Sequence, residues 1–209
     1  MGLDWNPMSR PLAGHEEEFA RLFAELNAGS FSDDDPRLER FRAISEAPFT
    51  TLGAPRVGES PEADAWLQAN LREGASLDEA RAAMRGYYVL DLLPEHEGFP
   101  VYSNYGLYDG IDRYSFRAKF LDDVADVIGE ALMERAYTHM LAPELRAYGD
   151  ALYQRAQAFA REHGVEHVEG VREIEDDVGT PARRAHILFA AATWCRFWAD
   201  RGHGLDPWF

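Results

Sequence analysis

The stretch from Thr180 to Gly202 constrains the fold more than any other part of the sequence. Thr180-Pro181 is a typical helix start, and Gly202 is a typical helix end. Helical spacing produces two apolar stripes between them: Ile187, Ala191, Trp194 and Trp198 form one, and Phe189 and Phe197 form the other. A helix that is apolar nearly all round has to be buried. We therefore predict that this segment is the central helix of a helical domain.

Two more long helices are predicted in the C-terminal half, over residues 116–141 and 143–163. Each has apolar residues at a helical period on one face. The inward residues are Phe120, Val124, Val127, Ile128, Ala131 and Leu132 in the first, and Leu145, Tyr148, Leu152, Ala156 and Phe159 in the second. The sequence thus predicts a mainly α protein, a helical bundle in which three long helices share one interior.

Shorter helices are predicted in the N-terminal half. Their expected starts are His15, Pro36, Pro61 and Ser76. The stretch 48–61 holds three prolines and two glycines, which is typical of a loop. We predict one domain over 1–209, with a subdivision near 48–61. The apolar run 87–93 fits a strand as well as a buried helix, so the pattern is also compatible with a short strand pair.

The chain is strongly acidic, with 37 acidic and 21 basic residues and a formal net charge of −16. Such a field repels nucleic-acid backbones and anionic lipid surfaces. We therefore expect neither nucleic acid nor a membrane as a partner, whereas cationic ligands, metal ions and basic surfaces are better tolerated. The basic residues are arginines except for Lys119, which is typical of a GC-rich bacterial genome. A Schiff-base mechanism would have to use this lysine.

Cysteine usage and hydropathy indicate a cytoplasmic protein. Cys195 is the only cysteine, so an intramolecular disulfide is excluded. Residues 1–10 lack the apolar core of a signal peptide, and the apolar run 187–195 is too short to span a bilayer. The sequence has no G-x-S-x-G elbow, P-loop, G-x-G-x-x-G or paired C-x-x-C. The sequence therefore lacks the motifs that usually indicate a hydrolase, an NTPase, a Rossmann dehydrogenase or a zinc ribbon.

An acidic stripe lies in the predicted helix 116–141. Its members recur at intervals of four and so share one face: Asp122, Asp126, Glu130 and Glu134. Like charges at this spacing repel, so something must compensate. One hypothesis is a divalent-cation site formed by Asp122, Asp126 and Glu130, because such cations prefer oxygen ligands. The alternatives are a solvated face that arginines reach from neighbouring helices, and a docking face for a basic partner.

Within this stripe, Asp122-Asp123-Val124-Ala125-Asp126 resembles the DDxxD magnesium motif of class I terpene and prenyl-chain synthases. The resemblance implies a helical enzyme whose carboxylates bind Mg²⁺ and a diphosphate. Asp176-Asp177-Val178-Gly179-Thr180 is similar to the start of their second metal motif, but Arg184 occupies the position of its final glutamate. The chain is also shorter than that fold requires, so the resemblance is confined to short motifs.

The pentapeptide His163-Gly164-Val165-Glu166-His167 matches the H-x-x-E-H spelling of inverted zinc peptidases. Zinc binding by both imidazoles requires one continuous helix. Gly164 is instead typical of a helix C-cap, and a histidine in the last turn suits the negative end of the helix. We therefore expect the helix to stop at this glycine.

An irregular segment, 94–115, precedes the long helices and holds two prolines and four of the nine tyrosines. Side chains suited to ligand binding concentrate here and just beyond: Tyr102, Asn104, Tyr105, Tyr108, Asp109, Arg113 and Arg117. Binding residues often lie on loops that a rigid scaffold holds, and tyrosine combines a large ring with a polar tip. We predict that 102–117 lines a ligand site. The alternative is a surface loop whose tyrosines pack on the bundle.

Three functions follow from these patterns. The first is a non-catalytic helical protein that binds a small molecule or a protein partner through 102–117. The second is a divalent-metal-dependent enzyme that uses Asp122, Asp126 and Glu130. The third is a structural protein that forms a homodimer through an apolar helix face. The sequence identifies no substrate, reaction or partner.

Overall fold

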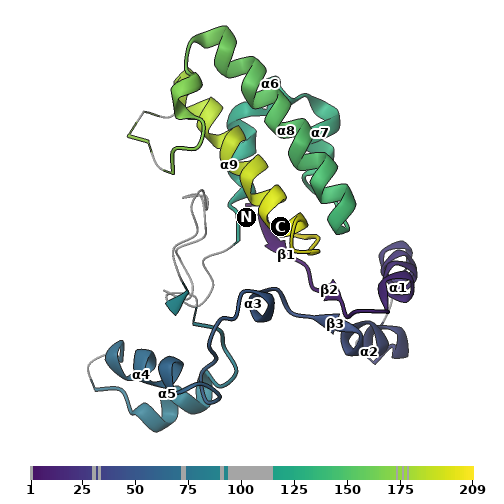
Figure 1. Cartoon of the computed structure of the whole chain (residues 1–209), viewed down its shortest axis with the longest axis vertical. Coiled ribbons are helices and arrows are strands. Elements are labelled where there is room, and N and C mark those ends of the chain that lie inside the picture. The colour runs from purple at the N-terminus through teal and green to yellow at the C-terminus, as the bar shows by residue number, and fades with distance from the viewer. Residues whose placement is uncertain are drawn as a thin grey trace.

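The computed structural model describes residues 2–29, 32, 34–71, 74–89, 92–93, 115–172, 174–175, 177 and 179–209. The protein is mainly helical, with two small two-stranded antiparallel sheets, so the predicted fold class is confirmed (Figure 1). In chain order the elements are β1 (Asp4–Pro7), β2 (Arg10–Pro11), α1 (Glu16–Ala28), α2 (Pro36–Ala43), β3 (Ser45–Glu46), α3 (Pro48–Thr51), α4 (Pro61–Ala69), α5 (Leu77–Ala83), η2 (Ala118–Val124), α6 (Ala125–Ile128), α7 (Glu130–Arg135), α8 (Ala142–His163), η3 (Glu166–Val168), α9 (Pro181–Ala199) and β4 (Leu205–Trp208).

Helix α9 forms the centre of the main apolar core, as the sequence predicts. Trp194 and Trp198 are fully buried, and most of the other residues of α9 are buried too. The Thr180 hydroxyl caps the helix by accepting a hydrogen bond from the Arg183 amide at 3.2 Å. Because nearly every face of α9 is apolar, the surrounding elements must cover it on all sides.

Helix α8 packs antiparallel against α9, and Figure 1 shows the two side by side. Gly149, near the start of α8, meets Cys195 near the end of α9. At the other end of the pair, the guanidinium of Arg184 lies over the Phe159 ring at 5.1 Å. The inward residues predicted for α8 are all buried: Leu145, Tyr148, Leu152, Ala156 and Phe159.

The prediction of one continuous helix over 116–141 is wrong. The segment is divided into the 3-10 helix η2 and two short α-helices, α6 and α7. Gly129 separates α6 from α7 with φ of 80°, a left-handed conformation that glycine adopts without steric cost. Apolar residues still face the core before the break, because Leu121 and Ile128 are buried, but Ala131 after it is exposed. The predicted apolar face is therefore buried before Gly129, although the segment is not one continuous helix.

The first and last strands pair with each other. β1 and β4 are antiparallel, with Asp4 opposite Trp208 and Pro7 opposite Leu205. Trp5 points into the main core, where its indole nitrogen donates a hydrogen bond to the Ala136 carbonyl at 2.8 Å. This strand pair therefore joins the two ends of the described chain, and a shorter pair joins β2 to β3. Of the apolar run 87–93 the structure describes 87–89 and 92–93, and among these Tyr88 forms an isolated bridge with Arg56.

The buried apolar residues that the structure describes form three clusters. The main one surrounds α9 and includes Trp5 and Phe116. A second joins α1 to α2 through Phe19, Leu22 and Ile44. A third joins α4 to α5 and consists of Val57, Ala63, Leu67 and Val89. In Figure 1 the α1–α2 and α4–α5 pairs each stand away from α8 and α9. The predicted single domain with a subdivision near 48–61 stays a prediction.

The stretch 48–61 is not wholly irregular, because it contains α3. Phe49 of this helix contacts Trp198 with ring centroids 6.2 Å apart, and Ala54 is buried in the main core. This short helix thus connects the N-terminal half to the centre of the fold. None of the helices that the structure describes has the length and apolar character needed to cross a membrane.

Candidate ligand-binding cleft

Most of the binding residues predicted from the sequence fall outside the described residues. These are Tyr102, Asn104, Tyr105, Tyr108, Asp109 and Arg113. Arg117 is described, and its Nε lies 3.6 Å from Oδ1 of Asp4. Burial raises the pKa of the Asp4 carboxyl, and the Arg117 guanidinium partly opposes that rise. Arg117 therefore compensates a buried carboxylate of β1.

Two members of the acidic stripe, Asp122 and Asp126, are compensated by basic side chains. Lys119 pairs with Asp122, and Arg184 reaches from α9 to Asp126 while its Nε donates to the Asp123 carbonyl at 3.1 Å. The hydrogen bond from Arg184 lowers the pKa of Asp126. Glu130 lies beyond the break at Gly129 and is exposed. Within the described ranges, no three His, Cys, Asp or Glu side chains are grouped as metal ligands. The contacts at Asp126 match the arginine alternative.

The H-x-x-E-H pentapeptide does not lie on one helix. Gly164 ends α8 in the left-handed region, with φ of 66°, and its amide donates to the Ala160 carbonyl. The second histidine, His167, follows in η3. The predicted C-cap is therefore confirmed, and the two imidazoles lack the helical register that this zinc motif needs.

A cleft of about 290 Å³ lies where the α1–α2 pair meets β4 and the residues after β1. We call it the α1–α2 cleft. Its described lining consists of Met8, Phe23, Leu26, Asn27, Leu38, Phe41, His139 and Asp206. The five apolar side chains come from the N-terminal arm, α1 and α2, and the polar ones lie at the edge. The cleft thus combines an apolar wall with a few converging polar groups, as small-molecule sites usually do.

The apolar wall is held by contacts between α1 and α2. Phe19 stacks on Phe41 with centroids 4.4 Å apart. Across the pair, Arg40 donates two hydrogen bonds to the Glu18 carboxylate, at 2.9 Å and 2.6 Å. These bonds from Arg40 lower the pKa of Glu18 to about 2. Leu141, just before α8, packs against the same cluster and joins it to the bundle.

The polar edge is held by an isolated bridge between Met140 and Leu205. Their amides and carbonyls exchange hydrogen bonds of 3.1 Å and 2.8 Å. The residues that flank this bridge, His139 and Asp206, meet outside it, with Nε2 of the imidazole 2.9 Å from Oδ1 of the carboxylate. The backbone bridge therefore fixes the spacing of this His–Asp pair.

A buried histidine fixes the Met8 backbone at the floor of the cleft. Met8 donates its amide hydrogen to the Gly204 carbonyl at 2.9 Å, and its carbonyl accepts from Nδ1 of His203 at 2.9 Å. Nε2 of His203 lies 2.7 Å from the Thr51 hydroxyl. Burial lowers the pKa of His203 to about 4, and the hydrogen bond to Met8 only partly opposes this. The ring is therefore neutral near pH 7, with its hydrogen on Nδ1.

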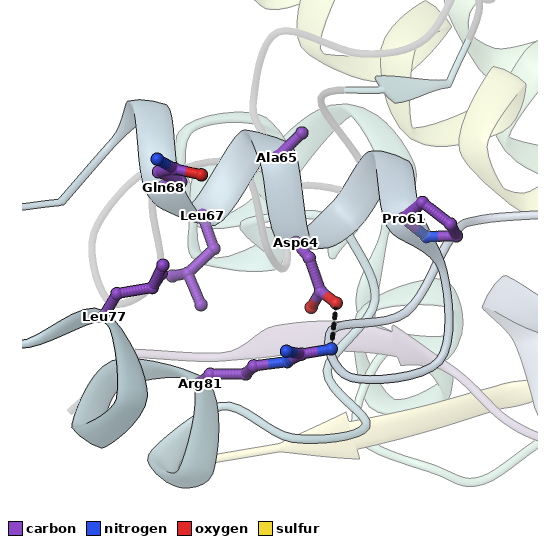
Figure 2. Close-up of a pocket in the computed structure, with 7 residues that line it drawn as sticks. All are labelled: Pro61, Asp64, Ala65, Leu67, Gln68, Leu77 and Arg81. Carbon is purple, nitrogen blue, oxygen red and sulfur yellow. Dashed lines mark hydrogen bonds and ion pairs between the residues drawn. The ribbon is translucent and has the colours of Figure 1, made fainter.

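A second hollow, of about 470 Å³, lies between α4 and α5, and Figure 2 shows its lining. Arg81 of α5 pairs there with Asp64 of α4, as the dashed line marks. The other oxygen of Asp64 accepts from the Gly58 amide at 2.8 Å. Leu67 and Leu77 supply apolar surface beside the pair. In this groove between α4 and α5, the negative charge of Asp64 is therefore in contact with the positive charge of Arg81.

Sequence reasoning did not find the α1–α2 cleft. Its lining comes from five separate parts of the chain, near residues 8, 23–27, 38–41, 139 and 206. No local motif links them, and only tertiary packing brings them together. The one sequence signal was the apolar face of α1, in which Phe23 and Leu26 recur at helical spacing. No protein-family model matches the chain, and the comparisons with curated proteins and with solved structures also found no significant match.

Proposed function

We propose that this protein binds a small amphipathic molecule in the α1–α2 cleft. The observation that supports the proposal is the composition of the cleft, an apolar wall closed at one edge by Asn27, His139 and Asp206. The cleft also lies at the junction of two apolar clusters, a position where ligand sites are common. An apolar ligand body would contact Phe23 and Phe41, and a polar group would meet the edge.

The chemistry of the lining favours binding over covalent catalysis. None of the lining residues that the structure describes carries a hydroxyl, a thiol or an amine. His139 and Asp206 can orient a polar group or exchange a proton, but no nucleophile lies beside them in this set. Non-covalent capture is therefore the function that these groups support.

The size of the cleft sets the expected affinity. Its volume of about 290 Å³ lies at the lower end of known ligand sites. Burying roughly six methylene groups contributes about 5 kcal/mol, which corresponds to a Kd of about 0.1–1 mM. Polar contacts at the edge would strengthen binding beyond this value. Ligand titrations should therefore extend to millimolar concentration.

The test uses the uncharged fluorophore N-phenyl-1-naphthylamine, whose emission rises in apolar surroundings. Asn27 lies on the exposed edge of the cleft, so Asn27→Trp should fill it without disturbing the apolar cluster. Leu38→Trp fills it from α2 as a second variant. Both should weaken binding about tenfold or more, because the space for the probe is lost. Leu12→Trp, at an exposed leucine away from the lining, is the matched control and should bind like the wild type.

The same assay also tests the segment 102–117, which the sequence predicts as a ligand site. The double variant Tyr105→Ala/Arg113→Ala should retain probe binding if the α1–α2 cleft is the site. Loss of binding in this variant, with normal binding by folded Asn27→Trp and Leu38→Trp, would contradict the cleft and support 102–117. Circular dichroism of each variant separates loss of binding from loss of fold.

A further inference from the structure

We propose that the α1–α2 cleft selects ligands whose apolar body ends in a protonated amine, and that the Asp206 carboxylate holds this group. The inference deepens the proposed function and rests on it. It names the charge of the ligand, which the shape and apolar character of the cleft leave undetermined.

The described lining contains one carboxylate and neither arginine nor lysine. Oδ1 of Asp206 lies 2.9 Å from Nε2 of His139, which leaves Oδ2 for a donor on the ligand. The Asp206 side chain is 54% exposed, so a ligand can reach it. An ammonium group donates up to three hydrogen bonds, and bonds from a charged donor to a carboxylate are among the strongest in proteins.

Apart from Arg42 of α2, the arginines on β2, α1 and α2 already have carboxylate partners. Their closest N–O distances are 2.6 Å for Arg37–Asp35, 2.6 Å for Arg40–Glu18, 2.5 Å for Arg21–Glu25 and 2.7 Å for Arg10–Glu46. A guanidinium that is paired in this way is less available to bind an anionic ligand or to neutralise Asp206. The net charge of −16 acts in the same direction, because it attracts cations and repels anions.

The groove between α4 and α5 lacks this preference. Its carboxylate, Asp64, contacts the guanidinium of Arg81, and Figure 2 shows the two side chains pointing toward each other. An amine that approached Asp64 would have to compete with this arginine. The two hollows therefore differ in charge compensation, and the α1–α2 cleft is the one that favours a cation.

The experiment measures the binding of three ligands of eight carbon atoms each, n-octylammonium, n-octanol and octanoate, to the full-length protein at pH 8. Displacement of N-phenyl-1-naphthylamine and isothermal titration calorimetry give the Kd of each. We expect n-octylammonium to bind about tenfold more tightly than n-octanol, because one charge-assisted hydrogen bond is added, and octanoate to bind more weakly than both. Added salt should reduce the preference for the amine.

Two variants assign the preference to one side chain. Asp206→Asn should abolish the preference and bring the Kd of n-octylammonium close to that of n-octanol. Asp78→Asn removes the same charge at an exposed position on α5 and should keep the wild-type preference. If the wild type binds n-octanol and n-octylammonium equally, the amine preference is overturned and the proposed function stands. If none of the ligands displaces the probe and the probe itself does not bind, the proposed function fails.

Discussion

Gly149 of α8 and Cys195 of α9 lie so close that a Cβ atom at residue 149 would be 2.7 Å from the Cys195 Cβ. The same added Cβ atom at residue 149 would lie 3.3 Å from the Ala192 carbonyl oxygen. Both neighbours belong to the central helix, which cannot move away without disturbing the core around it. The distance between the two longest described helices is therefore set by the absence of a side chain at one residue.

Gly149→Ala should destabilise the protein. The added methyl group forces the two helices apart at a fully buried contact, and overpacking of this kind costs about 1–3 kcal/mol. Urea unfolding followed by tryptophan fluorescence measures the loss. Gly29→Ala is the matched control, because that glycine is exposed and has ordinary backbone angles. Equal stability of the two variants would contradict the close packing of α8 on α9.

Gly204→Ala should be more damaging and should also abolish ligand binding. A Cβ at this residue would lie 2.2 Å from the Met140 carbonyl oxygen, a backbone atom that cannot move aside cheaply. The bridge from Met140 to Leu205 must then open, and His139 separates from Asp206. Loss of octylammonium binding by the folded fraction, measured by calorimetry, tests this. Unchanged binding would show that the bridge does not hold the polar edge.

His203 should make the protein less stable in mild acid. Its pKa is about 4 in the folded state and about 6.5 in an unfolded chain, so below pH 6.5 protons bind preferentially to the unfolded state. This group thus favours unfolding progressively as the pH falls from 6.5 to 4. The full difference corresponds to about 3 kcal/mol.

The measurement compares the free energy of unfolding at pH 7.5 and pH 4.5 in the wild type and in His203→Asn. Other groups contribute equally to both proteins, so the wild type should lose more stability than the variant by most of that amount. An NMR titration of the His203 ring gives the folded-state pKa directly. A midpoint near 6.5 would contradict the neutral buried imidazole.

Divalent cations should leave the melting temperature unchanged. Asp122 and Asp126 already have Lys119 and Arg184 as partners, and Glu130 follows the break at Gly129. A metal ion would therefore have to displace two basic side chains. Thermal unfolding with millimolar MgCl₂ or MnCl₂, against an EDTA control, measures the effect. A rise in Tm that EDTA reverses would restore the metal hypothesis.

The parts of the fold that the sequence predicts well depend on local patterns. The burial of Trp194 and Trp198 follows from a helix that is apolar nearly all round. The start at Thr180 and the end at Gly164 follow from capping chemistry within one turn of helix. Each of these signals depends only on residues close in the chain, so the rest of the fold does not change it.

The break at Gly129 was harder to predict, because glycine inside a helix costs only about 1 kcal/mol relative to alanine. Leu121, Val124 and Ile128 keep an apolar period that a continuous helix would also show. The α1–α2 cleft could not be predicted from the sequence. Its edge depends on Met140 pairing with Leu205, and no single-sequence pattern reports a backbone bridge between distant residues.

The pairing of β1 with β4 has a consequence for synthesis on the ribosome. β1 is made early, but the strand that completes its hydrogen bonds is made some two hundred residues later, about 10–40 s afterwards at ordinary elongation rates. The other partners of the Trp5 indole, the Ala136 carbonyl and Trp194 of α9, are also made more than a hundred residues after it. The nascent chain must therefore keep an aromatic strand from aggregating throughout translation, and the native core can close only once the last helix and strand have emerged.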